Sequence, residues 1–171
     1  MCRLAVQACD RRRIIQLASS SFQHGAEIPV HYATDRKDVS PELSWGEAPA
    51  GTRSFALIVH DPDAPRPGGF THWTAYNIPP ETSHIEENAP RIDVVSGFGT
   101  QGKNDEGKIG YMGPAPPSGT HRYFFRLYAL NATLELAAGA TPKEVSAAMK
   151  GHVIAQAELM GTYQNKRERA A

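Results

Sequence analysis

The chain has 171 residues, 40% of them hydrophobic, so it can bury the core of one domain without disulfides or metals. Its 18 Lys and Arg balance its 18 Asp and Glu, which excludes the strong net charge typical of nucleic-acid-binding proteins. Two cysteines, Cys2 and Cys9, match neither a redox motif nor a zinc pair. No apolar run approaches the roughly 18 residues of a membrane helix. We therefore expect a cytoplasmic protein with no nucleic-acid partner, no transmembrane segment and no cofactor.

The expected domain organisation is simple. Residues 1–18 mix apolar positions with Asp10 and the arginines at 11–13, which makes a poor signal peptide. We interpret residues 1–18 as a leader, residues 19–164 as the folded domain and residues 165–171 as a polar C-terminal tail. No internal repeat or long linker divides the domain.

Strand patterns dominate the chain from residue 28 onward. Residues 53–60 are almost continuously apolar and β-branched, which is typical of a strand buried on both faces. Residues 71–78 and 121–130 alternate between two faces, with Trp73 and Ala75 opposite His72. Weaker patterns predict strands at 28–32, at 43–45 and around Leu134.

One helix is predicted after these strands. Thr141 is a helix N-cap, Pro142 occupies the first helical position and Glu144 completes a capping box. Apolar spacing carries the predicted helix through His152 and Gln156 to Gly161, which is a typical C-terminal stop. Turn-separated strands with one late helix predict a mainly β fold, an antiparallel β-sandwich with a few peripheral helices that include this C-terminal one.

The sequence supports neither of two common enzyme motifs. Residues 97–102 read G-x-G-x-x-G, but no helix follows them, as a dinucleotide site requires, so we expect a flexible loop. No serine lies in a G-x-S-x-G nucleophile elbow. Neither a dinucleotide-dependent enzyme nor an α/β-hydrolase is indicated.

Titratable side chains gather where strands meet proline-rich loops. Asp61 ends an apolar strand, where a carboxylate is costly unless a partner pairs with it. His121 and Tyr123 share one strand face, while Arg122 points the other way. His72, on a neighbouring strand, is a candidate partner, although a histidine among aromatic residues is more often a core residue. These groups suit a small anionic ligand.

The same residues resemble the phosphatidylethanolamine-binding protein family, in its bacterial and archaeal Raf kinase inhibitor-like branch. The matching motifs are DPDAP at 61–65, F-x-H-W at 70–73, G-x-x-G-P-x-P-P at 110–117 and HRY at 121–123. Weaker similarity extends the match over about residues 19–164. The resemblance implies a β-sandwich with a surface pocket for phosphate-like anions, phosphorylated head groups or phosphorylated side chains. The ligand-binding residues implied are Asp61, Asp63, Phe70, His72, Gly113, Pro116, Pro117, His121 and Tyr123.

The family resemblance also implies a binding protein rather than an enzyme, a possible homodimer and a possible kinase or other signalling partner that the sequence does not name. Asp61 cannot itself attract an anion, so we expect it to accept a hydrogen bond from a histidine and favour the protonated ring. Phosphate binding would then strengthen as the pH falls. An alternative stays open: Asp61, His72 and His121 could form a metal site or run acid–base chemistry.

Two features depart from the family pattern. The link from Pro117 to His121 is short, which predicts a pocket rim of different shape. His60 stands where an acidic residue is more common, and strand alternation predicts that it points away from Asp61.

Overall fold

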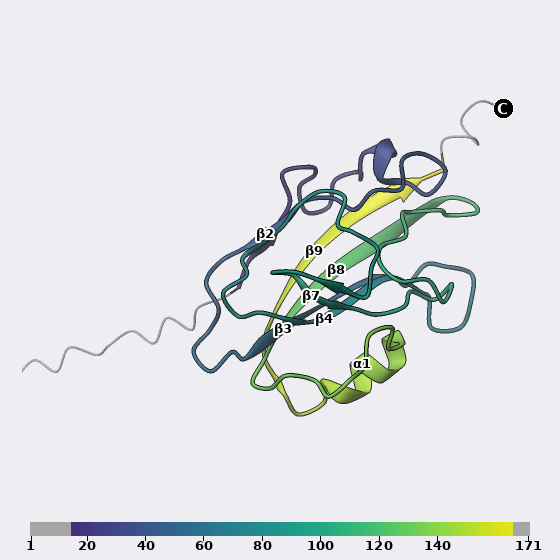
Figure 1. Ribbon diagram of the computed structural model, residues 1–171. Helices are drawn as coiled ribbons and strands as arrows, with labels where there is room; N and C mark the ends of the chain where they lie inside the picture. Colours follow the sequence, from purple (N-terminus) through teal and green to yellow (C-terminus); the bar gives the residue numbers. More distant parts are fainter. Residues whose placement is uncertain (1–14, 166–171) are drawn as a thin grey trace, which may run out of the picture.

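Two antiparallel β-sheets form the molecule (Figure 1), in a computed structural model that describes residues 15–165. The strands of the smaller sheet lie in the order β1 (Leu17–Ala18), β2 (Leu43–Trp45) and β5 (His84–Ile85). The strands of the larger sheet lie in the order β6 (Val94–Val95), β7 (Gly99–Gln101), β4 (Phe70–Ile78), β3 (Ser54–Asp61), β8 (Thr120–Leu130) and β9 (Val153–Gln164). A 3-10 helix, η1 (Val30–Tyr32), and an α-helix, α1 (Pro142–Ala148), complete the described elements.

The main core lies between the two sheets. Trp45 of the smaller sheet packs edge-on against Phe55 of β3, with 5.7 Å between ring centroids. The opposite face of the larger sheet is partly covered by α1, whose Val145 lies in a second core with Ile58 and Tyr76. Figure 1 shows α1 and β2 on opposite sides of the larger sheet. This arrangement confirms the predicted antiparallel sandwich with peripheral helices.

The three strong strand predictions are confirmed to within a residue at each end, as is the strand at 43–45. Two weaker strand predictions are wrong. Residues 28–32 contain η1 instead, and the Ile28 amide donates to the Thr162 carbonyl at the end of β9. The backbone around Leu134 is not a strand, because the Asn77 side chain bonds both the amide and the carbonyl of Leu134.

The predicted helix begins as expected but ends early. Thr141 and Glu144 form the capping box, yet α1 ends at Ala148 rather than near Gly161. Residues 153–164 form β9, which runs antiparallel to β8 along its whole length. Gly151, with a φ of 79°, turns the chain between helix and strand. Pairing with an 11-residue neighbour outweighs the helical pattern, which Gly151 also interrupts.

The G-x-G-x-x-G segment is not the flexible loop that we expected. Its residues 99–101 form β7, which pairs with β4. Gly99 adopts a φ of 108°, and a Cβ at this position would lie 2.8 Å from the carbonyl oxygens of Tyr76 and Asn77. The glycine therefore permits a close approach between strands.

The folded part begins before the expected boundary at residue 19. Ile15 and Leu17 are buried in the main core, so residues 15–18 belong to the domain rather than to a leader. The remainder of the predicted leader and residues 166–171 of the predicted tail lie outside the described residues. Within the described part, no helix is long and apolar enough to cross a membrane.

Candidate functional site

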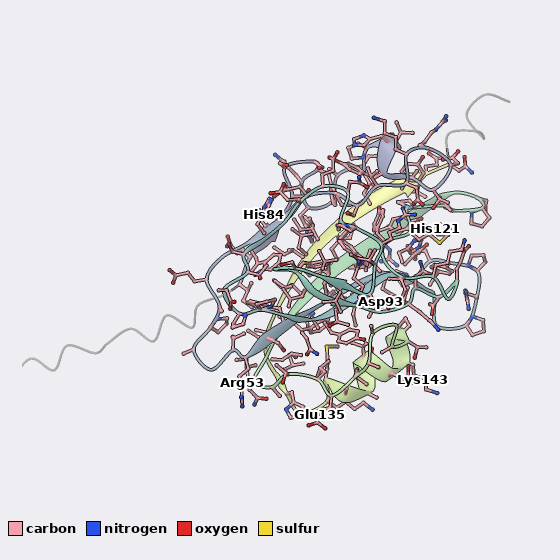
Figure 2. The ribbon with its side chains drawn as sticks, viewed as in Figure 1. Arg53, His84, Asp93, His121, Glu135 and Lys143 are labelled. Carbon is pink, nitrogen blue, oxygen red and sulfur yellow. The ribbon has the colours of Figure 1, made fainter. Side chains whose placement is uncertain are left out.

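A pocket of about 190 Å³ opens where β3, β4 and β8 meet their loops. Figure 2 shows His121 at this end of the molecule and Arg53 toward the opposite end. Five of the predicted ligand-binding residues line the pocket: Asp61, Phe70, His72, Pro117 and His121. The other four predicted residues do not line this pocket: Asp63, Gly113, Pro116 and Tyr123.

Asp61 and His121 form a buried pair at the base of the pocket. The Nδ1 atom of His121 lies 2.7 Å from Oδ2 of Asp61, and only 2% of Asp61 is exposed. The other carboxylate oxygen accepts the backbone amide of Asp63 at 2.8 Å. Asp61 thus holds the histidine as expected.

His72 reaches the same pocket through a β-bulge. Val59 pairs with Trp73 and His60 with Thr71, so His72 is an extra residue without a partner on β3. A bulge breaks strand alternation and re-aims a side chain. His72 therefore faces the His121 side of the sheet, although simple alternation placed it opposite Trp73.

The His72 ring is held tightly in apolar surroundings. It lies between Phe70 and Tyr123, with ring centroids 4.7 and 5.2 Å away. Its Nδ1 atom lies 2.9 Å from the Met112 carbonyl, which can only accept, so this nitrogen carries the hydrogen. Burial lowers the pKa of His72, and the Met112 carbonyl and the Asp61 charge oppose the shift only in part. The ring is therefore neutral at neutral pH.

Tyr123 supports the pocket from behind rather than lining it. Its side chain is buried, and its hydroxyl has no hydrogen bond of good geometry among the described residues. Burial, followed by the nearby Asp61 charge, raises the pKa of this phenol. Tyr123 therefore stays neutral, and its role here is to pack against His72.

Asp63 is turned away from the pocket. Its carboxylate oxygens accept from Nε and Nη2 of Arg122 at 2.9 and 2.7 Å, in a bidentate ion pair. These bonds lower the pKa of Asp63 to about 2. Asp63 thus anchors the loop after β3 to β8, and its charge is not available to a ligand.

Two other predicted residues, Gly113 and Pro116, belong to the walls around the pocket and not to its lining. The Gly113 amide donates to Asp38 at 2.7 Å, so the backbone donor that we expected near Gly113 is already used. Pro116 lines a separate cavity of about 180 Å³ with Thr34 and Tyr163, while Pro117 lies between that cavity and the main pocket. The proline wall therefore separates two cavities.

Sequence reasoning missed the cation of the pocket. Arg66 follows the DPDAP segment directly, and its guanidinium carbon lies 5.3 Å from the Phe70 ring centroid. Its position could have been predicted from the sequence, because Arg66 is a positively charged residue directly beside the candidate anion-binding segment at 61–65. The remaining lining residues are small or apolar: Ala64, Pro65, Met112 and Ala115.

His60 points to the opposite face, as predicted. Its Nδ1 atom lies 3.3 Å from the Thr71 hydroxyl, and burial followed by the Arg126 charge lowers its pKa. His60 therefore takes no part in the pocket.

The metal-centre alternative gains no support from the donor geometry. In the part of the chain that the structure describes, no three His, Cys, Asp or Glu side chains are placed to hold one ion together. Both Asp61 oxygens already accept hydrogen bonds, from His121 and from the Asp63 amide.

The family model for "Phosphatidylethanolamine-binding protein" matches residues 18–164. The UPF0098 protein of Methanothermobacter thermautotrophicus is 46% identical over 149 residues, covering 87% of this chain and 98% of that protein. The UPF0098 protein of Aquifex aeolicus is 48% identical over 153 residues, covering 88% of each chain.

Solved structures agree with this assignment. A phosphatidylethanolamine-binding protein homologue from Chlamydia trachomatis is 41% identical with a TM-score of 0.80, covering 89% of this chain and 98% of its own. Escherichia coli YbcL, described as a member of the mammalian PEBP family, is 32% identical with a TM-score of 0.82, covering 89% of this chain and 99% of its own. The resemblance read from the DPDAP, F-x-H-W and HRY segments is thus confirmed, and this chain belongs to the phosphatidylethanolamine-binding protein family.

Proposed function

We propose that this protein binds small ligands that carry a phosphoryl or similar oxyanion group, in the pocket between Arg66, His72 and His121, without chemically changing them. The observation that carries the proposal is the buried Asp61–His121 pair, which presents the Nε2 atom of His121 to a pocket with an arginine at its edge. A protonated imidazole and a guanidinium are directed donors to an oxyanion.

The walls of the pocket support binding rather than chemistry. Most of its lining is apolar, so water is displaced around the bound group and its charged hydrogen bonds strengthen. Among residues 15–165, no serine, threonine or cysteine lines the pocket as a nucleophile. Pro65 and Pro117 limit backbone adjustment around it.

The test is an NMR titration of the amide resonances with inorganic phosphate and with phosphoethanolamine. We expect saturable shifts at the residues around the pocket. Replacing His121 with Ala or Arg66 with Ala removes a charged hydrogen bond, which corresponds to a weakening of roughly 10- to 100-fold in Kd.

Arg53→Ala is the matched control, because Arg53 is exposed at the opposite end of the molecule (Figure 2). The control should bind as the unmodified chain does. Equal binding in the His121 and Arg66 variants, with their folds intact, would place the ligand elsewhere.

A further inference from the structure

The pocket has a polar base and an apolar rim. Its base consists of three buried side chains at the strand ends, Asp61, His72 and His121. The rim comes from the segments around them, and its apolar side chains are half-exposed or exposed: Ala64, Pro65, Phe70, Met112, Ala115 and Pro117. A ligand therefore meets polar groups in the depth of the pocket and apolar groups at its mouth.

The cavity is larger than a phosphoryl group. A phosphoryl group fills the space of about three water molecules, roughly 90 Å³. The pocket volume is about 190 Å³, so about half of it remains when such a group lies at the base. Both base histidines turn Nδ1 to a protein acceptor, the Met112 carbonyl for His72 and the Asp61 carboxylate for His121, so both rings are fixed in place there. The remaining space is bounded by the apolar rim.

This remaining space offers no partner to a positively charged part of a ligand. Among residues 15–165, Asp61 is the only carboxylate that lines the pocket. It is buried, and its two oxygens already accept from His121 and from the Asp63 amide. Arg66, whose guanidinium lies over the Phe70 ring at the rim, repels a cation. An ammonium group would therefore lose water here without gaining an ion pair.

We propose that the pocket selects phosphate monoesters with a neutral apolar body, alkyl or aryl, over those with a cationic body such as phosphoethanolamine. The phosphoryl group lies against His72, His121 and Arg66, and the carbon body lies against the apolar rim. The proposal rests on the proposed function, because it names the class of phosphoryl ligand that the same pocket takes.

Propyl phosphate and phosphoethanolamine are the matched probes. They have almost the same shape, but one chain ends in a methyl group and the other in an ammonium group. Phosphate monoesters lose their last proton with a pKa of about 6, so at about pH 7.5 both phosphoryl groups are mostly dianionic. Calorimetric titration of the full chain should give a Kd for propyl phosphate at least about fivefold lower, because the rim covers the methyl group and the ammonium stays unpaired.

A larger apolar body should bind more tightly. Methyl, propyl and phenyl phosphate present the same phosphoryl group with increasing apolar area. Each methylene that the rim covers should lower Kd by up to about fourfold, so Kd should fall in this order. Phenyl phosphate that binds no more tightly than methyl phosphate would show that the body does not touch the rim, and would overturn the inference.

A variant at the rim assigns the selection to this part of the pocket. Ala115 is exposed and lines the pocket. In Ala115→Asp a carboxylate can pair with the ammonium group, so the ratio of the two Kd values should shift toward phosphoethanolamine by roughly two- to fivefold. Ala115→Asn is the matched control, since it has the same shape without the charge and should keep the ratio of the unmodified chain. Equal ratios in the two variants would place the ligand body elsewhere and overturn the inference.

The same chemistry is found in free phosphate monoesters and in phosphotyrosine side chains. Phenyl phosphate and a short phosphotyrosine peptide with uncharged neighbouring residues distinguish these two sources. Binding of either supports the proposal, and the tighter of the two identifies the source.

The outcomes separate the two proposals. Phosphoethanolamine that binds as tightly as propyl phosphate overturns the selection while leaving the anion pocket intact. Binding of none of the probes, inorganic phosphate included, overturns the proposed function and this inference together.

Discussion

His72 shows how one inserted residue changes the chemistry of a strand end. Without the bulge between the Val59–Trp73 and His60–Thr71 pairs, alternation would direct His72 away from His121. The bulge brings both imidazoles to one pocket but gives them different surroundings, an apolar one for His72 and a carboxylate for His121. Two identical side chains are therefore held by different neighbours in one pocket.

The lowered pKa of His72 should appear in the pH dependence of stability. The folded ring resists a proton that the unfolded chain accepts near pH 6.5, so this contribution to stability is complete above pH 6.5 and is lost as the pH falls below it. In His72→Asn the free energy of unfolding should fall less steeply between pH 6.5 and 5, by up to about 1.4 kcal/mol per pH unit.

Urea unfolding at several pH values measures this slope. His60, whose pKa is lowered in the same direction, should give a further reduction when it is also replaced by Asn. Identical slopes in the unmodified chain and the His72 variant, or an NMR titration of the His72 ring with a midpoint above 6.5, would contradict the interpretation.

At the scale of elements, α1 depends on its first turn. It has only seven residues, too few to be stable alone, and it covers part of the larger sheet through Val145. The capping box ties the Thr141 hydroxyl and backbone amide to Glu144. Local hydrogen bonds therefore set where the helix begins, and packing on the sheet holds it.

Replacing Thr141 with Ala removes the cap and should lower the free energy of unfolding by about 1 kcal/mol. Ser146→Ala is the matched control, since this exposed hydroxyl within α1 has no hydrogen bond among the described residues. Chemical denaturation of both variants measures the difference. A Thr141 variant as stable as the Ser146 variant would show that the cap contributes nothing.

At the scale of the whole molecule, the pocket wall is held by a segment distant in sequence. The Thr34 hydroxyl donates to the Gly113 carbonyl and the Gly113 amide donates to Asp38, both at 2.7 Å. Pro114 also accepts from the Thr34 amide at 3.1 Å. The pocket shape thus depends on the packing of residues 34–38 against the proline-rich loop.

Gly113→Ala should disturb this contact. A Cβ at position 113 would collide with the Tyr32 carbonyl and lie 2.7 Å from the Thr34 amide, so the two segments must separate. We expect a loss of at least about 2 kcal/mol in the free energy of unfolding, as for other overpacked sites, together with weaker phosphate binding.

Gly119→Ala is the companion variant. Gly119 has a φ of 66° but open space around its Cβ position, so it should lose only about 1 kcal/mol from backbone strain. Thermal and urea unfolding of both variants, with phosphate titration, measure the contrast. Equal losses in the two variants would mean that the approach of residues 32–34 to the pocket wall is unimportant.

The sequence by itself determined, to within a residue at each end, the strands at 54–61, 70–78 and 120–130, and it determined the start of α1, because apolar runs and a capping box are local patterns. It also indicated the pairing of Asp61 with a histidine, since a carboxylate ending a buried strand needs a partner. Only the tertiary structure decided the rest. Long-range pairing made 153–164 a strand, the bulge turned His72 into the pocket, and contacts from Arg122 and Asp38 occupied Asp63 and Gly113. Each of these depends on residues far apart in the chain, which no local pattern records.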